Sequence, residues 1–152
     1  MKKKAIIVSI KGSKLSKQEI LLLSQEYPWG LILFKRNIKS FEQVKKLINT
    51  IKKITKDKKF PILIDEEGLS VSRLKNIFDH NIEANFFGNL FKLDQKIAIE
   101  LYNNYLGSLC QKLKMIGINI NTIPVLDISN KNTSRIIGKR SFSGNKKIVK
   151  KL

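Results

Sequence analysis

Short apolar runs alternate with longer amphipathic segments along this chain, and this alternation limits the possible folds more than any other feature. The first three runs occupy residues 5–10, 30–34 and 61–65, and a fourth begins at Ile118. Segments with helical spacing separate the runs. Neighbouring parallel strands need such crossovers, whereas antiparallel strands can be joined by tight turns. The order therefore predicts an α/β fold with about four parallel strands and covering helices.

Capping residues mark the starts of the first two helices. Ser16 is followed three positions later by Glu19, the spacing of a capping box, and Ile20 and Leu23 of this helix are expected to face a core. Ser40 opens a second helix. Its apolar positions recur at helical spacing: Phe41, Val44, Leu47, Ile48, Ile51 and Ile54.

A third, long helix is predicted after residues 66–92, which have the pattern of an irregular segment. Asp94 is a suitable N-cap, and Gly117 lies where a C-terminal glycine belongs. The apolar stripe of this helix recurs every four residues: Ile97, Leu101, Tyr105, Leu109 and Leu113. After a loop over residues 129–144, residues 145–152 have the pattern of the first turns of another helix.

Length and composition indicate a globular protein. At 152 residues the chain has the length of one domain, so residues 1–152 are expected to form a single domain. A hydrophobic fraction of 42% is typical of globular rather than disordered chains. No apolar run approaches the roughly 20 residues that a membrane-spanning helix needs, so no membrane partner is expected.

Two features predict a cytoplasmic protein. The N-terminus MKKKAIIVSI has the charge of a signal peptide, but its apolar run is only about five residues long and no small-residue cleavage site follows. The one cysteine, Cys110, cannot form an internal disulfide, which agrees with a reducing compartment. Cys110 lies next to the apolar stripe of the third helix and is expected to be in the core.

The chain is strongly basic, with 30 basic and 12 acidic residues and a formal charge of +18. Only four of the basic residues are arginine, and the 26 lysines are scattered in short groups. A nucleic-acid-binding face would more often carry clustered arginines interleaved with aromatic rings. The pattern therefore favours solvated helix faces and disfavours nucleic acid as a partner.

Charged residues collect where the apolar runs end. Residues 65–67 are Asp-Glu-Glu, so a quarter of the acidic residues follow one strand. Residues 34–37 (Phe-Lys-Arg-Asn) end the second run, and Asp127 and Arg140 follow the fourth. Ligands of parallel α/β folds meet the carboxyl ends of the strands, because the loops there are free to vary. The pattern indicates a site, although a solvated loop rim would have a similar composition.

Metal and triad chemistry have little support. A metal site needs several His, Cys or acidic ligands at suitable spacing, and the chain has one histidine, His80, and one cysteine. A Ser–His–Asp triad would have to use His80 without a recognisable nucleophile elbow. The sequence GKRS at residues 138–141 lacks the upstream glycine of a phosphate-binding loop. We therefore expect no metal and no cofactor.

Four segments, taken in order, resemble the motifs of glycoside hydrolase family 3. They are GLILFKRN (30–37), ILIDEEGLSVSRL (62–74), IPVLDI (123–128) and IGKRSFS (137–143). Any one of them alone is a weak signal, but four in the same order and with similar spacing are specific. The resemblance is greatest to the bacterial β-N-acetylhexosaminidases of cell-wall recycling.

This resemblance implies a fold, a ligand and three binding residues. The catalytic domain of the family is a TIM barrel, so four strands correspond to a partial (β/α)8 TIM barrel, the N-terminal half. The ligand would be an N-acetylglucosamine-containing saccharide from peptidoglycan. Asp65, Arg73 and Arg140 match family residues that contact the non-reducing sugar. Their chemistry is suitable, because a carboxylate accepts hydrogen bonds from hydroxyls and a guanidinium donates a rigid fork of them.

The chain also departs from the family pattern. Leu69 and Ser70 replace a glycine and an arginine, so the loop after the third strand is expected to differ in shape. The family's histidine-rich motif, its aspartate–histidine acid/base pair and its aspartate nucleophile have no match in residues 1–152. We therefore assign no catalytic residue and expect this polypeptide alone to be inactive, since retaining hydrolysis needs both groups.

Two other functions are compatible with the sequence. One is a half-barrel module that assembles with a second half, either as a homodimer or with a separate chain. The other is a basic protein that binds nucleic acid or another anionic surface, which would show a steep loss of binding with salt.

Overall fold

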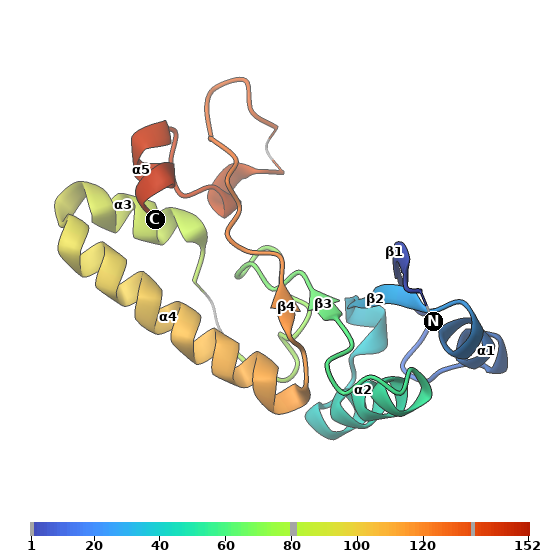
Figure 1. Cartoon of the computed structure of the whole chain (residues 1–152). Helices are drawn as coiled ribbons and strands as arrows, with labels where there is room; N and C mark the ends of the chain where they lie inside the picture. The colour runs from blue at the N-terminus through green and yellow to red at the C-terminus, as the bar shows by residue number, and fades with distance from the viewer. Residues whose placement is uncertain (1, 80–81, 135) are drawn as a thin grey trace. The chain divides into compact units, whose positions relative to one another are not determined.

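The computed structural model describes residues 2–79, 82–134 and 136–152, and its elements are labelled in Figure 1. The described chain divides into two compact units. The first unit consists of Met1–Asp65, Arg73–Asp79 and Lys112–Asn121. The second consists of Glu66–Ser72, His80–Gln111 and Thr122–Leu152.

The first unit contains one parallel sheet, as the sequence predicted. Its strands follow one another in the order β1-β2-β3-β4, and each pairs in parallel with its neighbour. Their bounds are Lys4–Val8 (β1), Pro28–Leu33 (β2), Ile62–Ile64 (β3) and Ile120–Asn121 (β4). The fourth strand is shorter than its apolar run, and Leu126 beyond it is 67% exposed. A sheet of this order, with helical crossovers, confirms the predicted α/β class.

Two helices of the first unit begin at the predicted caps. Helix α1 (Lys17–Gln25) has a complete capping box, since Ser16 Oγ accepts from the Glu19 backbone N–H and the Glu19 carboxylate accepts from that of Ser16. Helix α2 (Phe41–Ile54) begins after Ser40, whose side chain accepts from Gln43. The short 3-10 helix η1 (Lys35–Asn37) lies between β2 and α2.

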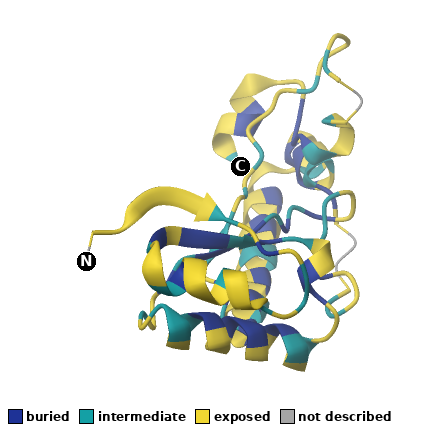
Figure 2. Cartoon of the chain, turned by 90° about the vertical axis from the view of Figure 1, so that its right-hand side faces the viewer, coloured by how far each residue is buried: buried dark blue, intermediate teal, exposed yellow. Residues whose placement is uncertain are grey.

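The core of the first unit lies between the sheet and α2. Apolar side chains of β2, β3 and α2 are buried: Leu31, Leu33, Ile62, Leu63, Ile64, Val44, Leu47, Ile48 and Ile51. Only Leu23 of α1 is buried, and the expectation that Ile20 faces the core was wrong, because it is 38% exposed. Strand β1 lies at the sheet edge, and Figure 2 shows it, beside the N-terminal label, as almost wholly exposed.

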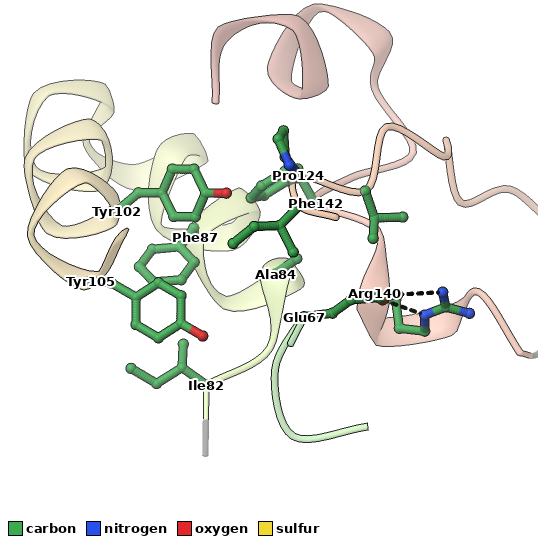
Figure 3. A pocket seen from close by; sticks show the side chains of 11 residues that line it. Glu67, Ile82, Ala84, Phe87, Tyr102, Tyr105, Pro124, Arg140 and Phe142 are labelled. Carbon is green, nitrogen blue, oxygen red and sulfur yellow. Dashed lines mark hydrogen bonds and ion pairs between the residues drawn. The ribbon is translucent and has the colours of Figure 1, made fainter. Parts of the chain in front are cut away.

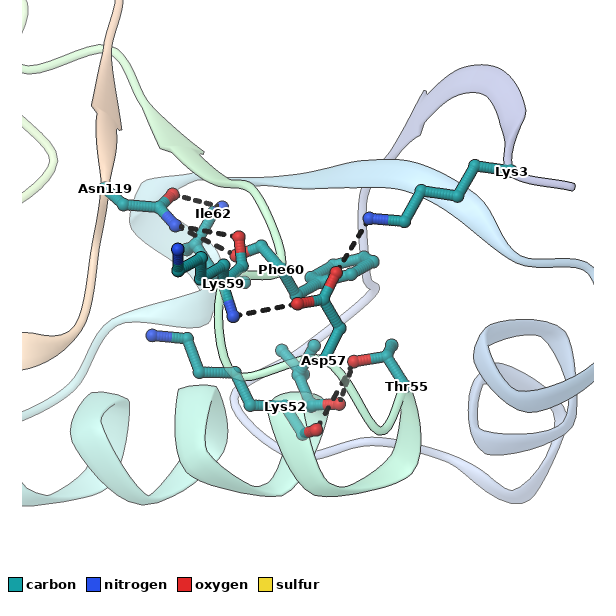
Figure 4. Close-up of polar contacts among 9 residues, drawn as sticks. Lys3, Lys52, Thr55, Asp57, Lys59, Phe60, Ile62 and Asn119 are labelled. Carbon is teal, nitrogen blue, oxygen red and sulfur yellow. Dashed lines mark hydrogen bonds and ion pairs between the residues drawn. The ribbon is translucent and has the colours of Figure 1, made fainter. Parts of the chain in front are cut away.

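Polar side chains connect the segments at the amino ends of β3 and β4. This end of the sheet is opposite the carboxyl ends, where the charged residues lie. Asn119 Oδ1 accepts from the Ile62 backbone N–H at 2.7 Å, and Asn119 Nδ2 donates to the Phe60 carbonyl at 3.0 Å (Figure 4). Lys52 Nζ donates to the Gly117 carbonyl at 2.9 Å. Gly117 has a φ of +101°, which favours glycine and confirms the predicted end of the long helix.

The second unit is mainly helical. Helix α3 (Ala84–Leu93) falls in the stretch that the sequence predicted to be irregular, so that prediction was wrong for these residues. Helix α4 (Gln95–Ile116) begins in this unit after Asp94, whose carboxylate accepts from the Ile97 backbone N–H. The other elements are η2 (Gly138–Arg140) and α5 (Lys146–Lys151).

The core of the second unit is built by residues of α3, α4 and α5 together with the segment that follows η2. Phe87, Tyr102, Phe142 and Val149 form one buried cluster. Gly88 of α3 lies so close to the backbone of Phe142 that a Cβ there would meet the Phe142 carbonyl oxygen at 1.6 Å.

The buried stripe of α4 is shifted from the predicted one at the start of the helix. Ile97 and Leu101 are 48% and 43% exposed, whereas their neighbours Ala98 and Tyr102 are buried. The C-terminal part of the predicted stripe was correct, since Leu109 and Leu113 are buried. Cys110 is exposed, so its predicted place in the core was wrong. No helix among the described residues has the length and apolar character to cross a membrane.

Candidate functional site

Asp65 and Arg73 form an ion pair at the carboxyl end of β3. Asp65 follows the strand directly, and Arg73 lies eight residues later in an irregular segment. Arg73 Nη2 donates to Asp65 Oδ2 at 3.3 Å, and the two side chains are 27% and 23% exposed. Both therefore reach solvent while remaining in contact. The structure thus brings together two of the three predicted binding residues.

Side chains from the end of β2 hold the loop that follows β1. Asn37 is completely buried, and its amide donates to the carbonyls of Ile10 at 3.0 Å and Gly12 at 2.9 Å. Asn37 Oδ1 accepts from the Phe34 backbone N–H at 2.8 Å. The loops after β1 and β2 are therefore fixed to each other by one side chain.

Arg36 adds two further bonds to the same loop. Its Nε donates to the Ile10 carbonyl and its Nη2 to Ser9 Oγ, each at 3.0 Å. The Arg36 guanidinium carbon also lies 4.6 Å from the centroid of the Phe34 ring. Sequence reasoning assigned no binding role to Phe34, Arg36 or Asn37, although their position directly after β2 was a usable signal.

Arg140, the third predicted residue, belongs to the second unit and pairs with Glu67 (Figure 3). Arg140 Nε and Nη2 donate to the two carboxylate oxygens of Glu67 at 2.7 and 2.9 Å. Their side chains are 21% and 11% exposed, so the pair is mostly shielded from water. Two parallel bonds fix the plane of the guanidinium as well as its position.

A narrow pocket borders this pair and has room for about one water molecule. Aromatic rings form much of its wall: Phe87, Tyr102, Tyr105 and Phe142 (Figure 3). Burial raises the pKa of Tyr102 to about 12, with a smaller contribution from Tyr105. Burial, followed by the charges of Glu66 and Glu83, raises the pKa of Tyr105 to about 12. Both phenols therefore keep their protons at neutral pH.

The loop after β3 is ordered by its own contacts. The backbone N–H groups of Glu67 and Gly68 donate to the Val71 carbonyl at 2.9 and 3.3 Å. Gly68 has a φ of +151°, and a Cβ there would lie 2.4 Å from the Ile82 carbonyl oxygen. Ser70, one of the two departures from the family pattern, donates to Glu83 Oε1 at 2.5 Å. Ser70 therefore links this loop to the residue that precedes α3.

Glu66, the middle residue of the three consecutive acids, is completely buried. Its neighbour Glu67 accepts two hydrogen bonds from Arg140. The three consecutive acids thus have three different environments. The sequence contained no signal for this difference, because burial of Glu66 depends on residues far away in the chain.

The metal and triad alternatives gain no support from the described residues. Among them, no group of three or more His, Cys, Asp or Glu side chains is placed to hold a metal ion. His80, the histidine that those alternatives require, lies outside the described residues.

A parallel sheet with helical crossovers and charged side chains at the carboxyl ends of its strands is typical of α/β proteins that bind ligands at that end of the sheet, and the first unit has these features. The chain belongs to glycosyl hydrolase family 3, because the model of the glycosyl hydrolase family 3 N terminal domain matches residues 3–152. The family predicted from the four motifs is therefore confirmed.

Two curated relatives of the chain are beta-hexosaminidases. The chain is 37% identical over 139 residues to a beta-hexosaminidase of Haemophilus ducreyi, covering 90% of this chain and 39% of the relative. It is 29% identical over 143 residues to the beta-hexosaminidase of Haemophilus influenzae, covering 94% of this chain and 39% of the relative. The chain thus spans about two fifths of the length of these relatives.

Solved structures agree with this result. The native NagZ structure from Neisseria gonorrhoeae matches with a TM-score of 0.87 and 30% identity, covering 98% of this chain and 43% of that one. NagZ from the same organism in complex with N-trifluoroacetyl-D-glucosamine matches with a TM-score of 0.85 and 28% identity, covering 98% and 44%. The predicted fold, part of a TIM-barrel-like domain, is confirmed by these matches.

Proposed function

We propose that residues 1–152 hold a sugar ring of an N-acetylglucosamine-containing saccharide, as part of a β-N-acetylhexosaminidase that acts on peptidoglycan fragments in the cytoplasm. The ion pair between Asp65 and Arg73 at the end of β3 is the observation that carries this proposal. The family resemblance assigns sugar contacts to both residues and to Arg140. The NagZ structure with N-trifluoroacetyl-D-glucosamine supports the class of ligand.

The chemistry of the pair suits a sugar hydroxyl. An ionised carboxylate offers only acceptors and a guanidinium only donors, whereas a hydroxyl does both. One hydroxyl can therefore donate to Asp65 and accept from Arg73. Their mutual bond of 3.3 Å is longer than the 2.7–2.9 Å of a strong charge-assisted bond, so a hydroxyl can compete for both groups at low cost.

Arg140 differs, because Glu67 binds it through two short bonds. We infer that Glu67 holds the Arg140 guanidinium in a fixed plane. This role requires arginine rather than lysine, since an ammonium cannot make the bidentate pair.

The test is a titration of the 152-residue polypeptide with N-acetylglucosamine, followed by amide chemical shifts. We expect Asp65→Asn, which keeps the shape and removes the charge, to weaken binding about tenfold or more, since a hydrogen bond to a charged group contributes about 1.5–3 kcal/mol. Glu100→Gln, a change on the exposed surface of α4, is the matched control and should bind like the wild type. Equal binding by Asp65→Asn and the wild type would refute the proposal.

We also expect this polypeptide to bind sugar without hydrolysing it. The acid/base pair and the nucleophile that the family resemblance calls for have no match in its sequence, and neither step of a retaining mechanism proceeds without them. A chromogenic β-N-acetylglucosaminide should therefore release no dye. Turnover that survives purification and disappears in Asp65→Ala would overturn this expectation.

A second candidate function is that of a half-barrel module, and the edge strand β1 favours it. Among the described residues β1 pairs only with β2, and Ile6 and Ile7 are 52% and 45% exposed. An apolar strand edge can pair with a strand of another chain. Sedimentation of the 17.5-kDa polypeptide tests for a homodimer, which Ile7→Lys should dissociate. A monomer at all concentrations would exclude the homodimer.

A further inference from the structure

Glu83 is a buried carboxylate that the proposed function does not use. It is 9% exposed and occupies the N-cap position of α3. A carboxylate at this position often accepts from the N–H groups of the first turn, but the Glu83 side chain makes no capping bond. It accepts a hydrogen bond from Ser70, in the loop after β3. The carboxylate therefore contacts a different segment of the chain rather than its own helix.

The bond between Ser70 and Glu83 is short. Ser70 Oγ lies 2.5 Å from Glu83 Oε1, at the lower end of the range of about 2.5–2.7 Å for a hydroxyl that donates to an ionised carboxylate. Burial of a carboxylate is costly unless the group is hydrogen-bonded. The bond is therefore expected to hold the Ser70 side chain firmly, although the residue as a whole is exposed.

The loop that carries Ser70 is compact and packs against the segment before α3. The backbone N–H groups of Glu67 and Gly68 both donate to the Val71 carbonyl, at 2.9 and 3.3 Å. The backbone at Gly68 comes so near that segment that a Cβ would lie 2.4 Å from the Ile82 carbonyl oxygen. Because these contacts join the two ends of the loop, Ser70 and Glu67 move together rather than independently.

Glu67, at the start of this loop, holds Arg140 (Figure 3). Arg140 Nε and Nη2 donate to its two carboxylate oxygens at 2.7 and 2.9 Å. Because a bidentate pair fixes the plane of the guanidinium, a shift or rotation of the carboxylate changes the direction of that plane. Contacts thus connect Glu83 to Ser70, the loop to Glu67, and Glu67 to Arg140, and all of them lie within the second unit.

We propose that Glu83 is a positioning residue, whose bond to Ser70 fixes the loop after β3 and thereby the Arg140 guanidinium that receives the sugar. Glu67 transmits this effect, since it belongs to the loop and holds the guanidinium. This inference rests on the proposed saccharide-binding function. It assigns a role to Ser70, one of the two departures from the family pattern. Ser70 and Glu83 make no contact with the sugar in this proposal, so their effect on binding is indirect.

The experiment compares Ser70→Ala, which removes the hydroxyl, with Ser70→Thr, which retains one. The Nε–Hε signal of Arg140, identified by its loss in Arg140→Lys, reports the pair with Glu67 through its chemical shift and its exchange with water. We expect this signal to shift and to exchange faster in Ser70→Ala, and to stay as in the wild type in Ser70→Thr. N-acetylglucosamine binding should weaken about two- to fivefold in Ser70→Ala and be preserved in Ser70→Thr, because the other contacts of the loop remain.

A double-mutant cycle tests whether Glu83 acts through Ser70. Glu83→Gln retains the size of the side chain and removes its charge, so it should also move the Arg140 signal and weaken binding. Because the two residues share one bond, the double variant should bind sugar about as weakly as the weaker single variant.

Ser108→Ala, at an exposed serine of α4, is the matched control and should leave the Arg140 signal and sugar binding unchanged. Thermal unfolding checks that each variant is folded. If Glu83→Gln does not fold, the comparison of Ser70→Ala with Ser70→Thr still decides the matter, because Ser70 is exposed and its substitution disturbs no core.

Several outcomes would overturn the inference. An Arg140 signal that is the same in Ser70→Ala and the wild type would show that the bond does not influence the guanidinium. Equal losses of binding in Ser70→Ala and Ser70→Thr, or losses that multiply in the double variant, would also contradict it. A wild-type polypeptide that does not bind N-acetylglucosamine would refute the proposed function instead, while the Arg140 signal would still test the link between Ser70 and Glu67.

Discussion

At the scale of single residues, Asn37 is the clearest example of a polar side chain that determines local structure. Its buried amide satisfies two carbonyls of the β1–α1 loop and one N–H at the end of β2. The loops after β1 and β2 therefore depend on the buried side chain of Asn37. Our proposal assigns this side chain no contact with the ligand.

We predict that Asn37→Ala lowers the free energy of unfolding by about 2–4 kcal/mol. The substitution removes the Asn37 bonds to the Gly12 carbonyl and the Phe34 N–H, whereas the Ile10 carbonyl keeps its bond from Arg36, and each shielded group left unsatisfied costs about 1–3 kcal/mol. Urea unfolding measures the change. Asn49→Ala, on the exposed surface of α2, should change the free energy by no more than about 0.5 kcal/mol. Equal effects of the two substitutions would contradict the assigned role.

Two helical glycines provide a second prediction at this scale. Gly88→Ala would place a Cβ 1.6 Å from the Phe142 carbonyl oxygen, whereas a Cβ at Gly107 of α4 would meet nothing within 4 Å. Gly88→Ala should therefore destabilise the protein by about 1–3 kcal/mol or more, since α3 must move away from a backbone group.

Gly107→Ala should have the opposite sign, a gain of about 0.5–1 kcal/mol from helix propensity. Thermal unfolding of both variants under the same conditions gives the comparison. A stable Gly88→Ala protein would mean that α3 does not approach the segment around Phe142 as closely as described.

At the scale of elements, the N-terminus of α1 links helix stability to pH. Glu19 accepts hydrogen bonds from the backbone N–H groups of Ser16 and Lys11. Partial burial raises the pKa of Glu19, but these bonds to its charged form outweigh the burial, so the pKa lies below the ordinary value of 4.5. The folded state therefore binds the proton of Glu19 less tightly than the unfolded state does.

We predict that this contribution to stability is complete above pH 4.5 and is lost as the pH falls through the lowered pKa. Glu19→Gln retains a capping-box side chain but cannot titrate. Urea unfolding at pH 6 and pH 3 should show a smaller loss of stability for Glu19→Gln than for the wild type. Parallel pH profiles for the two proteins would rule out this role of Glu19.

The elements that the sequence predicted correctly are those with local signals. Helices α1 and α2 begin at capping residues, and the strands are apolar runs of suitable length. The stripe of α4 was only half correct for a geometric reason. A step of four residues advances about 40° beyond a full turn, so a strict four-residue stripe winds off one face of the helix.

The buried set of α4 instead keeps the average of 3.6 residues per turn: Ala98, Tyr102, Leu109, Leu113 and Ile116. Helix α3 was missed because no capping residue marks its start, where Glu83 makes no capping bond. Asp65 and Arg73, which the motifs singled out as sugar-binding residues, form an ion pair, and their sugar binding stays a prediction. The contacts of Phe34 with Arg73 and of Glu67 with Arg140 join separate segments, so only the folded structure reveals them.

At the scale of the whole molecule, the charge of +18 is a matter separate from the carboxylates of the site. Lysines lie mostly on exposed surfaces, as on α2, where Lys45 and Lys46 are exposed beside the buried Leu47. Such a surface keeps the protein soluble, but the like charges repel one another and weaken the compact state. Asp65 and Glu67 each neutralise the arginine with which they pair, so these two pairs add nothing to the net charge.

We therefore predict that sodium chloride stabilises this protein. Raising the salt from about 0.01 M to about 0.1 M shortens the screening length from about 30 Å to about 10 Å, which weakens repulsion between lysines on the surface. Each 1 kcal/mol gained should raise Tm by roughly 2–4 °C for a chain of this length.

Potassium chloride should act equally, because screening depends on ionic strength. The effect should shrink near pH 10, where lysines begin to lose their protons. A Tm that falls as salt is added would mean that attractive ion pairs outweigh the repulsion.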